Sequence, residues 1–174
     1  MNPKANTLLA LILATGMTNT ALAECQGGEN TAIPAATPIE GFFDFNNGQV
    51  LHRPTQLIWM RCAIGQVWTG GGCSGEPELL NWAAALNAAT DAGLDGHSDW
   101  RLPNRNELNS IVESRCYDPA INGSIFPDTP NQGFWTASPA AADTAWNLDF
   151  DQGELILRPT GETAAVRLVR GGRL

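Results

Sequence analysis

Two arginines lie close to a tryptophan in residues 99–108, DWRLPNRNEL. A guanidinium group presents several N–H donors in one plane, so Arg101 and Arg105 beside Trp100 would suit an anion held against an aromatic face. In the structural alternative, Trp100 points inward, Arg101 donates to carbonyls and carboxylates that tie loops to a sheet, and Pro103 fixes the approach to a helix. We favour the structural role for Arg101 and expect Arg105, on an exposed first turn, to contact a ligand.

A second pattern of polar residues indicates a calcium site. Asn147, Asp149 and Asp151 alternate along a predicted strand into a turn, which would point three oxygen-bearing side chains to one face. They resemble, loosely, the Trp-Asn-Asp calcium site of lectins. The alternative is that a hairpin at this place requires turn-forming residues anyway. The two histidines, His52 and His97, stand in no Ser-His-Asp arrangement that would indicate a catalytic triad.

Six tryptophans in one small domain indicate a core rich in indole rings, because each buries a large apolar area. Trp59, Trp100 and Trp135 are therefore expected to be structural. Trp68 lies in a glycine-rich loop, and we expect it to be exposed and able to stack against a sugar.

Arg167 and Arg170 lie on a predicted strand near the C-terminus. Their separation of three residues places them on opposite faces of that strand. We expect a structural role for both, with one of them buried and paired with an acid such as Asp149.

The first residues have the features of a secretory signal. Lys4 gives a basic start, residues 7–17 form an apolar core too short to span a bilayer, and Ala21-Leu22-Ala23 suits signal peptidase. We expect residues 1–23 to be removed and the protein to be exported to the periplasm, the cell surface or the medium. No later segment predicts a transmembrane helix.

Removal of 23 of the 174 residues leaves 151, a length that fits one domain. These residues carry nine basic side chains, all arginine, against eighteen acidic ones, a net charge of −9. Such a balance makes the chain a poor general ligand for nucleic acid, heparin or anionic lipid.

Four cysteines remain in the exported chain, and an even count in an exported protein predicts two disulfides. Three pairings exist. We favour Cys62–Cys73, which brackets a glycine-rich loop, with Cys25–Cys116 joining an N-terminal arm to the body. The cysteines show no CxxC or CxH spacing typical of a metal site.

The order of the predicted elements is strands, two helices, a long loop and further strands, which is typical of an α+β fold with an antiparallel sheet. Residues 24–40 predict an extended arm and residues 41–174 the domain itself. Within it we expect a hairpin turning at Asn47-Gly48, a strand over 56–60, a helix over 74–93, a second helix capped by Asn104 and Glu107, a loop over 117–133, and strands over 134–138, 145–150, 154–158 and 164–170. Four residues, Leu79, Trp82, Ala83 and Leu86, have the spacing of an apolar stripe on the first of these helices.

Several motifs together make the chain resemble a known family. They are FNNGQV, QLIWMRC, GQVW, NWAAALNAA, GHSDWRLPNRNEL, PAIN, FWTASP, AWNLDF and VRLVRGG. In this order they resemble the Lcl C-terminal domain family, named for the terminal domain of a bacterial collagen-like adhesin, from about Phe42 to Gly172. The resemblance implies a C-type-lectin-like fold, with two helices packed on a small twisted antiparallel sheet, adjacent first and last strands and a long loop region. It also implies an exported adhesive role, including binding of sulfated host polysaccharide, and no shared catalytic residues.

We therefore expect a non-enzymatic binding module for a glycan or a surface protein, without a required cofactor unless calcium binds. One alternative is a structural or assembly component of the cell envelope without a small ligand. Another is an enzyme like the sulfatase-activating enzymes, which share this broad fold class but need reactive thiols. The sequence leaves the ligand and the oligomeric state open.

Overall fold

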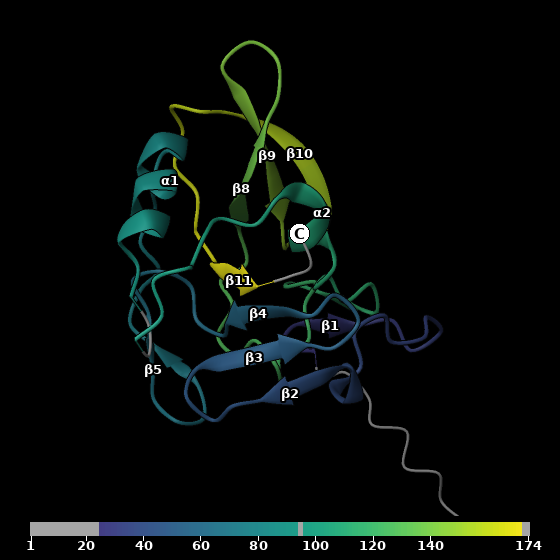
Figure 1. Cartoon of the computed structure of the whole chain (residues 1–174). Helices are drawn as coiled ribbons and strands as arrows, with labels where there is room; N and C mark the ends of the chain where they lie inside the picture. The colour runs from purple at the N-terminus through teal and green to yellow at the C-terminus, as the bar shows by residue number, and fades with distance from the viewer. Residues whose placement is uncertain (1–24, 94–95, 172–174) are drawn as a thin grey trace, which may run out of the picture.

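Two antiparallel sheets form the body of the protein (Figure 1). The computed structural model describes residues 25–93 and 96–171, so the predicted signal peptide, residues 1–23, lies outside the described residues. The four-stranded sheet has the order β11-β4-β3-β2, made of β11 (Val169–Gly171), β4 (Leu57–Met60), β3 (Gln49–His52) and β2 (Phe42–Asp44). The three-stranded sheet has the order β10-β9-β8, made of β10 (Glu154–Pro159), β9 (Thr144–Asp149) and β8 (Gly133–Pro139).

Two short strand pairs complete the sheets. One consists of β1 (Gly28–Glu29) and β7 (Cys116–Tyr117), and the other of β5 (Val67–Trp68) and β6 (Cys73–Ser74). The first pair and the disulfide Cys25–Cys116 hold the predicted N-terminal arm, which ends in a 3₁₀ turn (Ile39–Gly41), against the body. The second disulfide joins Cys62 to Cys73, so both predicted disulfides are confirmed.

The first helix, α1 (Trp82–Asp91), is shorter than predicted. Its N-cap is Asn81, whose side chain accepts a hydrogen bond from the N–H of Ala84 at 2.9 Å. The prediction that residues 74–81 are helical is wrong, because their backbone groups bond elsewhere: Leu80 pairs with Ala164 in both directions, and the Glu78 N–H donates to the Ile64 carbonyl.

The predicted apolar stripe of α1 is also wrong in part. Leu79 lies before the helix and is exposed, and Ala83 faces solvent. The buried positions are Ala85 and Ala89, one turn apart, with Trp82 half-buried beside them. The Trp82 indole N–H donates to the Thr136 carbonyl at 2.8 Å and so ties α1 to β8.

The second helix, α2 (Arg105–Asn109), begins as predicted. The side chain of Asn104 accepts from the N–H of Glu107, and the Glu107 carboxylate accepts from the N–H of Asn104, which completes a capping box. Leu108 is fully buried and points into the core.

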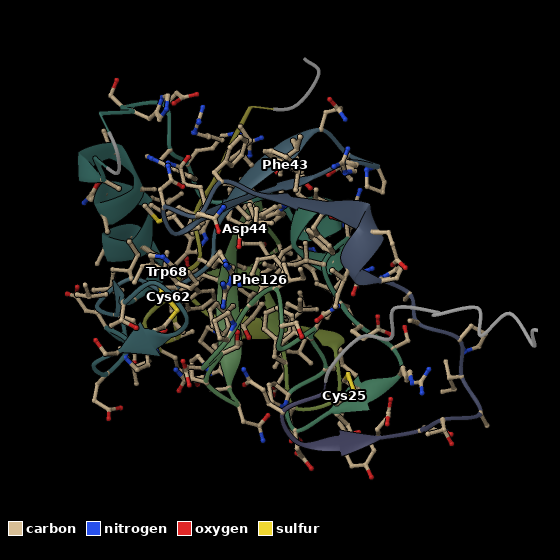
Figure 2. All side chains as sticks on the ribbon, turned by 90° about the horizontal axis from the view of Figure 1, so that it is seen from below. Cys25, Phe43, Asp44, Cys62, Trp68 and Phe126 are labelled. Atoms are coloured by element: carbon tan, nitrogen blue, oxygen red, sulfur yellow. A yellow bond between two sulfur atoms is a disulfide. The ribbon has the colours of Figure 1, made fainter. Side chains whose placement is uncertain are left out.

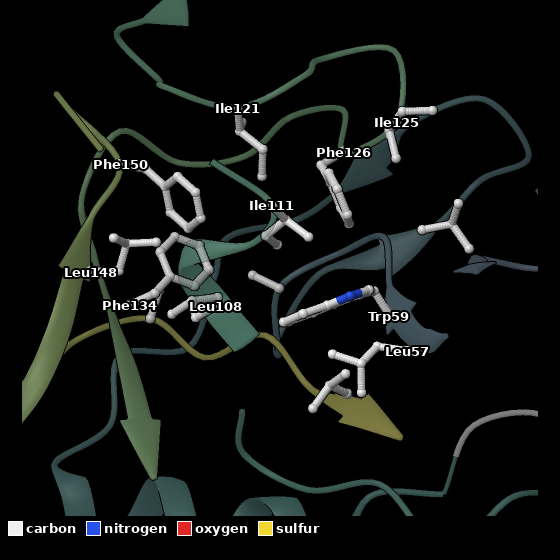
Figure 3. Packing of buried hydrophobic residues seen from close by; sticks show 14 of the residues in the cluster. Leu57, Trp59, Leu108, Ile111, Ile121, Ile125, Phe126, Phe134, Leu148 and Phe150 are labelled. Carbon is white, nitrogen blue, oxygen red and sulfur yellow. The ribbon is translucent and has the colours of Figure 1, made fainter. Parts of the chain in front are cut away.

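The main core lies between the two sheets and α2 (Figure 3). Trp59 from β4, Phe134 from β8 and Leu108 from α2 are all fully buried there. A second cluster under α1 contains Trp100, Leu102 and Trp135. The predicted structural burial of Trp59, Trp100 and Trp135 is thus confirmed, as is the α+β class. The strands, however, form several sheets rather than one, and the last strand pairs with β4 rather than with the first.

The hairpin at Asn47-Gly48 and the strand predicted over 164–170 also differ from prediction. The Asn47-Gly48 hairpin is present, but four residues separate β2 from β3, with Asn46 and Gly48 at positive φ, so it is not a two-residue turn. Residues 164–168 run beside the sheets through isolated bridges, and only residues 169–171 form a ladder. No helix in the described ranges is long and apolar enough to cross a membrane.

Candidate functional site

A pocket of about 130 Å³ opens beside Trp68, at the end of the four-stranded sheet. Met60 at the end of β4 contributes to the wall, and Gly48 comes from the loop before β3. The remaining wall is the segment that follows β4: Cys62, Ala63, Ile64, Gly65, Gln66 and Trp68. Trp68 and Cys62 lie next to each other at the edge of the molecule in Figure 2.

The disulfide and a short hairpin set the position of Trp68. Cys62–Cys73 closes the loop, and Trp68 pairs with Cys73 in the β5–β6 ladder. Gly48 packs closely against the Trp68 side chain. Its φ is +86°, and a Cβ at this position would lie 3.0 Å from the Cβ of Trp68. Glycine is therefore required at position 48 for the backbone conformation and for the close approach.

Arg61 covers one face of the Trp68 ring. Its Cζ lies 4.2 Å from the ring centroid, and its Nη1 lies 2.6 Å from Oδ2 of Asp44 on β2. Further N–H groups of Arg61 donate to the Ser124 and Ile125 carbonyls, each at 2.7 Å. Burial lowers the pKa of Arg61, and the charge and hydrogen bond of Asp44 partly offset this effect. The chain Asp44–Arg61–Trp68 thus links β2 to the pocket.

The pocket offers a ligand mostly apolar surface. Gln66 is already engaged, because its side-chain oxygen accepts from the Ala63 N–H and its amide donates to the Asp128 carbonyl, both at 3.1 Å. The indole Nε1 of Trp68 is buried and has no acceptor among the described residues.

Exposed apolar side chains occur on β2, just after it, and next to Trp68. Phe43 and Phe45 flank Asp44 and are 47% and 40% exposed, and Val67, next to Trp68, is 65% exposed. The two phenyl rings meet edge to face with centroids 5.2 Å apart. Phe43 alternates with Asp44 along β2, so its ring points away from the face on which Asp44 meets Arg61. In the view of Figure 2, Asp44 lies between Phe43 and Trp68.

The sequence indicated Trp68 but missed its surroundings. We expected Trp68 to be exposed, whereas it is half-buried because Arg61 and Gly48 pack against it. Arg61 follows a predicted strand and precedes a cysteine, which gave no hint of its contacts. The Gly48 signal was read only as a turn.

Arg101 has the predicted structural role, but on the surface. Its guanidinium forms a two-pronged ion pair with Glu107 at 2.7 and 2.8 Å, while its side chain is 44% exposed. Its backbone pairs with Val169, which joins the DWRLP segment to β11. Trp100 and Pro103 are buried, as the structural alternative requires.

Arg105 is exposed, as predicted, and lies far along the chain from the pocket residues. Its Cζ lies 4.8 Å from the ring centroid of Trp146, which is half-buried on β9. The Arg105 N–H donates to the Ser138 hydroxyl at 3.0 Å. The structure therefore places the two predicted contacts, Trp68 and Arg105, in separate surroundings, each with its own aromatic–guanidinium pair.

Arg167 is fully buried, but the expected partner was wrong. Its guanidinium donates to the carbonyls of Met60 and Arg61 and to the Thr129 hydroxyl, not to Asp149. The phenyl ring of Phe126 lies under it, with the centroid 4.8 Å from Cζ. Burial, and next the charge of Arg61, lowers the pKa of Arg167 to about 9.

Arg170 lies on the other face, as predicted. It bonds to the Gln49 side chain at 3.2 and 3.3 Å, approaches Asp99 at 4.0 Å and lies over the Trp100 ring, 5.4 Å from its centroid. It therefore fastens β11 to β3 and to the DWRLP segment, a structural role.

The three residues of the predicted calcium site have different surroundings. Asn147 is fully buried, while Asp149 accepts from the Asp151 N–H at 3.1 Å. Asp151 instead shares the Asn131 amide with Asp118, at 3.2 and 3.1 Å. In the part of the chain that the structure covers, no group of three or more His, Cys, Asp or Glu residues could hold a metal ion. Calcium binding by Asn147, Asp149 and Asp151 stays a prediction.

The comparison with protein families gives one match. The family model described as the Lcl C-terminal domain matches residues 48–170, which include the pocket, both helices and most strands. No curated protein matches the chain.

Proposed function

Because this chain belongs to the Lcl C-terminal domain family, we propose that it is an exported, adhesin-like binding module without catalytic activity that engages its ligand at the Trp68 pocket. The family resemblance supports adhesion and offers no set of catalytic residues. Two disulfides support an oxidising compartment outside the cytoplasm. A C-type-lectin-like arrangement and loss of residues 1–23 on export are parts of the same proposal.

The observation that carries the proposal is a mostly apolar pocket beside Trp68, with the exposed Val67 next to it. Its volume of about 130 Å³ is below the range of drug-sized sites, so it suits one inserted group rather than a whole oligosaccharide. An apolar side chain of a surface protein fits such a pocket, and Val67 would widen the contact. The preferred ligand is therefore a segment of a surface protein.

A glycan is the second candidate, and Arg105 favours it. Its guanidinium lies over Trp146 on the surface, which places an anion-binding group next to an aromatic ring. An acidic or sulfated sugar could contact both. Overall charge opposes a general affinity for polyanions, because the whole sequence carries a net charge of −8.

Selection of peptides from a displayed library against the oxidised protein, with a glycan array in parallel, tests both candidates. We expect the selected peptides to carry a large apolar residue, and Trp68→Ala to abolish their binding while Trp146→Ala leaves it intact. Trp146 is the matched control, because it also stacks on an arginine and is half-buried. Glycan binding that depends on Trp146 would favour the second candidate instead.

Running the glycan array in calcium and again in chelator tests the calcium prediction at the same time. Binding that disappears with chelator would support a site at Asn147, Asp149 and Asp151. No binding of peptide or glycan in either buffer would contradict the binding-module proposal and favour an envelope component held by a fixed partner.

A further inference from the structure

The chain contains two Asn-Gly pairs, and the structure places them in opposite environments. Asn47-Gly48 lies in the loop beside the Trp68 pocket, and Asn47 is exposed. Asn122-Gly123 is buried, with Asn122 fully inaccessible to solvent. Asn-Gly is the dipeptide in which a side-chain amide is attacked most easily by the following backbone nitrogen, because glycine has no Cβ to obstruct the approach.

We propose that Asn47 is a site of spontaneous deamidation that remodels the Trp68 pocket, whereas Asn122 is protected. In the first step, the Gly48 backbone nitrogen gives its proton to a solvent base and attacks Cγ of Asn47. The bond from Cγ to Nδ2 breaks, Nδ2 takes a proton from solvent and leaves as ammonia, and a five-membered succinimide forms. Water then adds to one of the two imide carbonyls and breaks one C–N bond, which yields aspartate or isoaspartate at position 47.

The local geometry favours the attack at Asn47. Its side-chain oxygen accepts a hydrogen bond from the Gln49 N–H at 3.2 Å, which folds the side chain back over the main chain. The same donor stabilises negative charge that develops on this oxygen when Cγ is attacked. Because the Asn47 side chain is exposed, water can reach it and ammonia can leave, while Gly48 beside it is buried.

Asn122 has the same local contact but lacks the exposure. Its side-chain oxygen accepts from the Ser124 N–H at 3.1 Å, and its amide also donates to the Thr37 carbonyl at 2.9 Å. That second bond anchors the leaving nitrogen, and burial excludes the water needed for hydrolysis. The two sites therefore differ in burial, not in their immediate sequence chemistry.

The consequence for the pocket follows from the position of Gly48. Its carbonyl accepts from the Arg61 N–H at 2.9 Å, and its Cα side packs against Trp68. Isoaspartate inserts one methylene group into the main chain just before this glycine, which displaces the support of the indole. Both products also add a carboxylate close to Asp44 and Arg61. That this change alters ligand binding rests on the proposed function, but the modification itself does not.

Peptide mapping by mass spectrometry after incubation of the oxidised protein at mildly alkaline pH tests the proposal. In the folded protein we expect deamidation at Asn47 to be at least about tenfold faster than at Asn122, since a buried site reacts only after local opening. In denaturant the two rates should become similar. A folded-state rate at Asn47 no higher than that at Asn122 would overturn the proposal.

Two variants separate the modification from its effect on the pocket. Asn47→Gln, whose longer side chain would have to close a larger ring, should abolish the fast site, while Asn47→Asp adds the charge without lengthening the main chain. The isoaspartate form, isolated by ion exchange, should show increased quenching of Trp68 fluorescence by acrylamide, measured as the difference from Trp68→Phe. Unchanged quenching would show that the pocket is not remodelled. This readout does not depend on any ligand, so it fails independently of the proposed function.

Discussion

The guanidinium groups of Arg167 and Arg101 differ in burial and in the kind of partner that each one binds. Arg167 is fully buried and donates to two backbone carbonyls and a hydroxyl, with a phenyl ring beneath it. Arg101 is 44% exposed and forms a two-pronged ion pair with Glu107. The buried arginine thus has uncharged partners, and the exposed arginine has the carboxylate.

The two arginines therefore have different effects. Arg167 mainly fixes a local geometry, whereas Arg101 adds to the free energy of folding. Burial lowers the pKa of Arg167 to about 9, because water is removed from a charge that no carboxylate compensates. What Arg167 contributes is a set of directed bonds that join the end of β4 to the loop at Thr129. In contrast, the hydrogen bonds that Arg101 donates to Glu107 raise the pKa of Arg101, although burial opposes this. The outer pair therefore stabilises the fold modestly at little desolvation cost.

The largest effect is expected at the core. Arg167→Ala should lower the free energy of unfolding by about 3–5 kcal/mol, because it leaves a cavity and buried acceptors without donors. Arg167→Met, which keeps most of the volume and removes the buried charge, should recover about 2 kcal/mol of that loss. Urea denaturation with the disulfides intact measures both. Equal losses for alanine and methionine would mean that the directed bonds, not the volume or the charge, dominate at this site.

A smaller effect is expected at the surface. Arg101→Ala should lower the free energy of unfolding by about 1 kcal/mol, because a two-pronged pair that is partly exposed to water contributes little. The matched control is Arg105→Ala at the first residue of α2, which should change the free energy of unfolding by less than about 0.5 kcal/mol. A loss of 2 kcal/mol or more for Arg101→Ala, by the same urea titration, would contradict the exposed position of this pair.

The sequence predicted most strongly where the signal was local. The capping box of Asn104 and Glu107 needs residues three positions apart, and it is present as predicted. The Cys62–Cys73 bond spans 11 residues and followed from the loop between them. The strands over 134–138 and 145–150 needed only their own apolar content.

Long-range partners were not predictable in the same way. The start of α1 depends on the backbone pairing of Leu80 with Ala164, 84 positions later. This strand-like pairing keeps the segment before α1 out of the helix. An acid such as Asp149 was expected to pair with whichever of Arg167 and Arg170 is buried. Arg167 is the buried one, and two of its acceptors are backbone carbonyls, which any residue can offer. Trp68 was predicted from its residue type. Its contact with Arg61 was not predictable in this way, because it depends on the pairing of β4 with β3.

Acid titration sharpens the comparison with the smallest expected change. Although burial raises the pKa of Glu107, the hydrogen bond from Arg101, the Asn104 N–H and the Arg101 charge hold it below its ordinary value. A carboxylate whose pKa is lowered by folding stabilises the protein above its unfolded pKa, about 4.3, and the stabilisation is lost as pH falls through the folded pKa. The stability difference between the wild type and Arg101→Ala should therefore shrink towards zero below about pH 4. The difference between the wild type and Arg167→Met should stay constant over the same range, because the acceptors of Arg167 carry no titrating group. Urea titrations of the wild type and both variants across this pH range measure the two differences. If both differences fell together, the assignment of the carboxylate partner to the surface arginine would be contradicted.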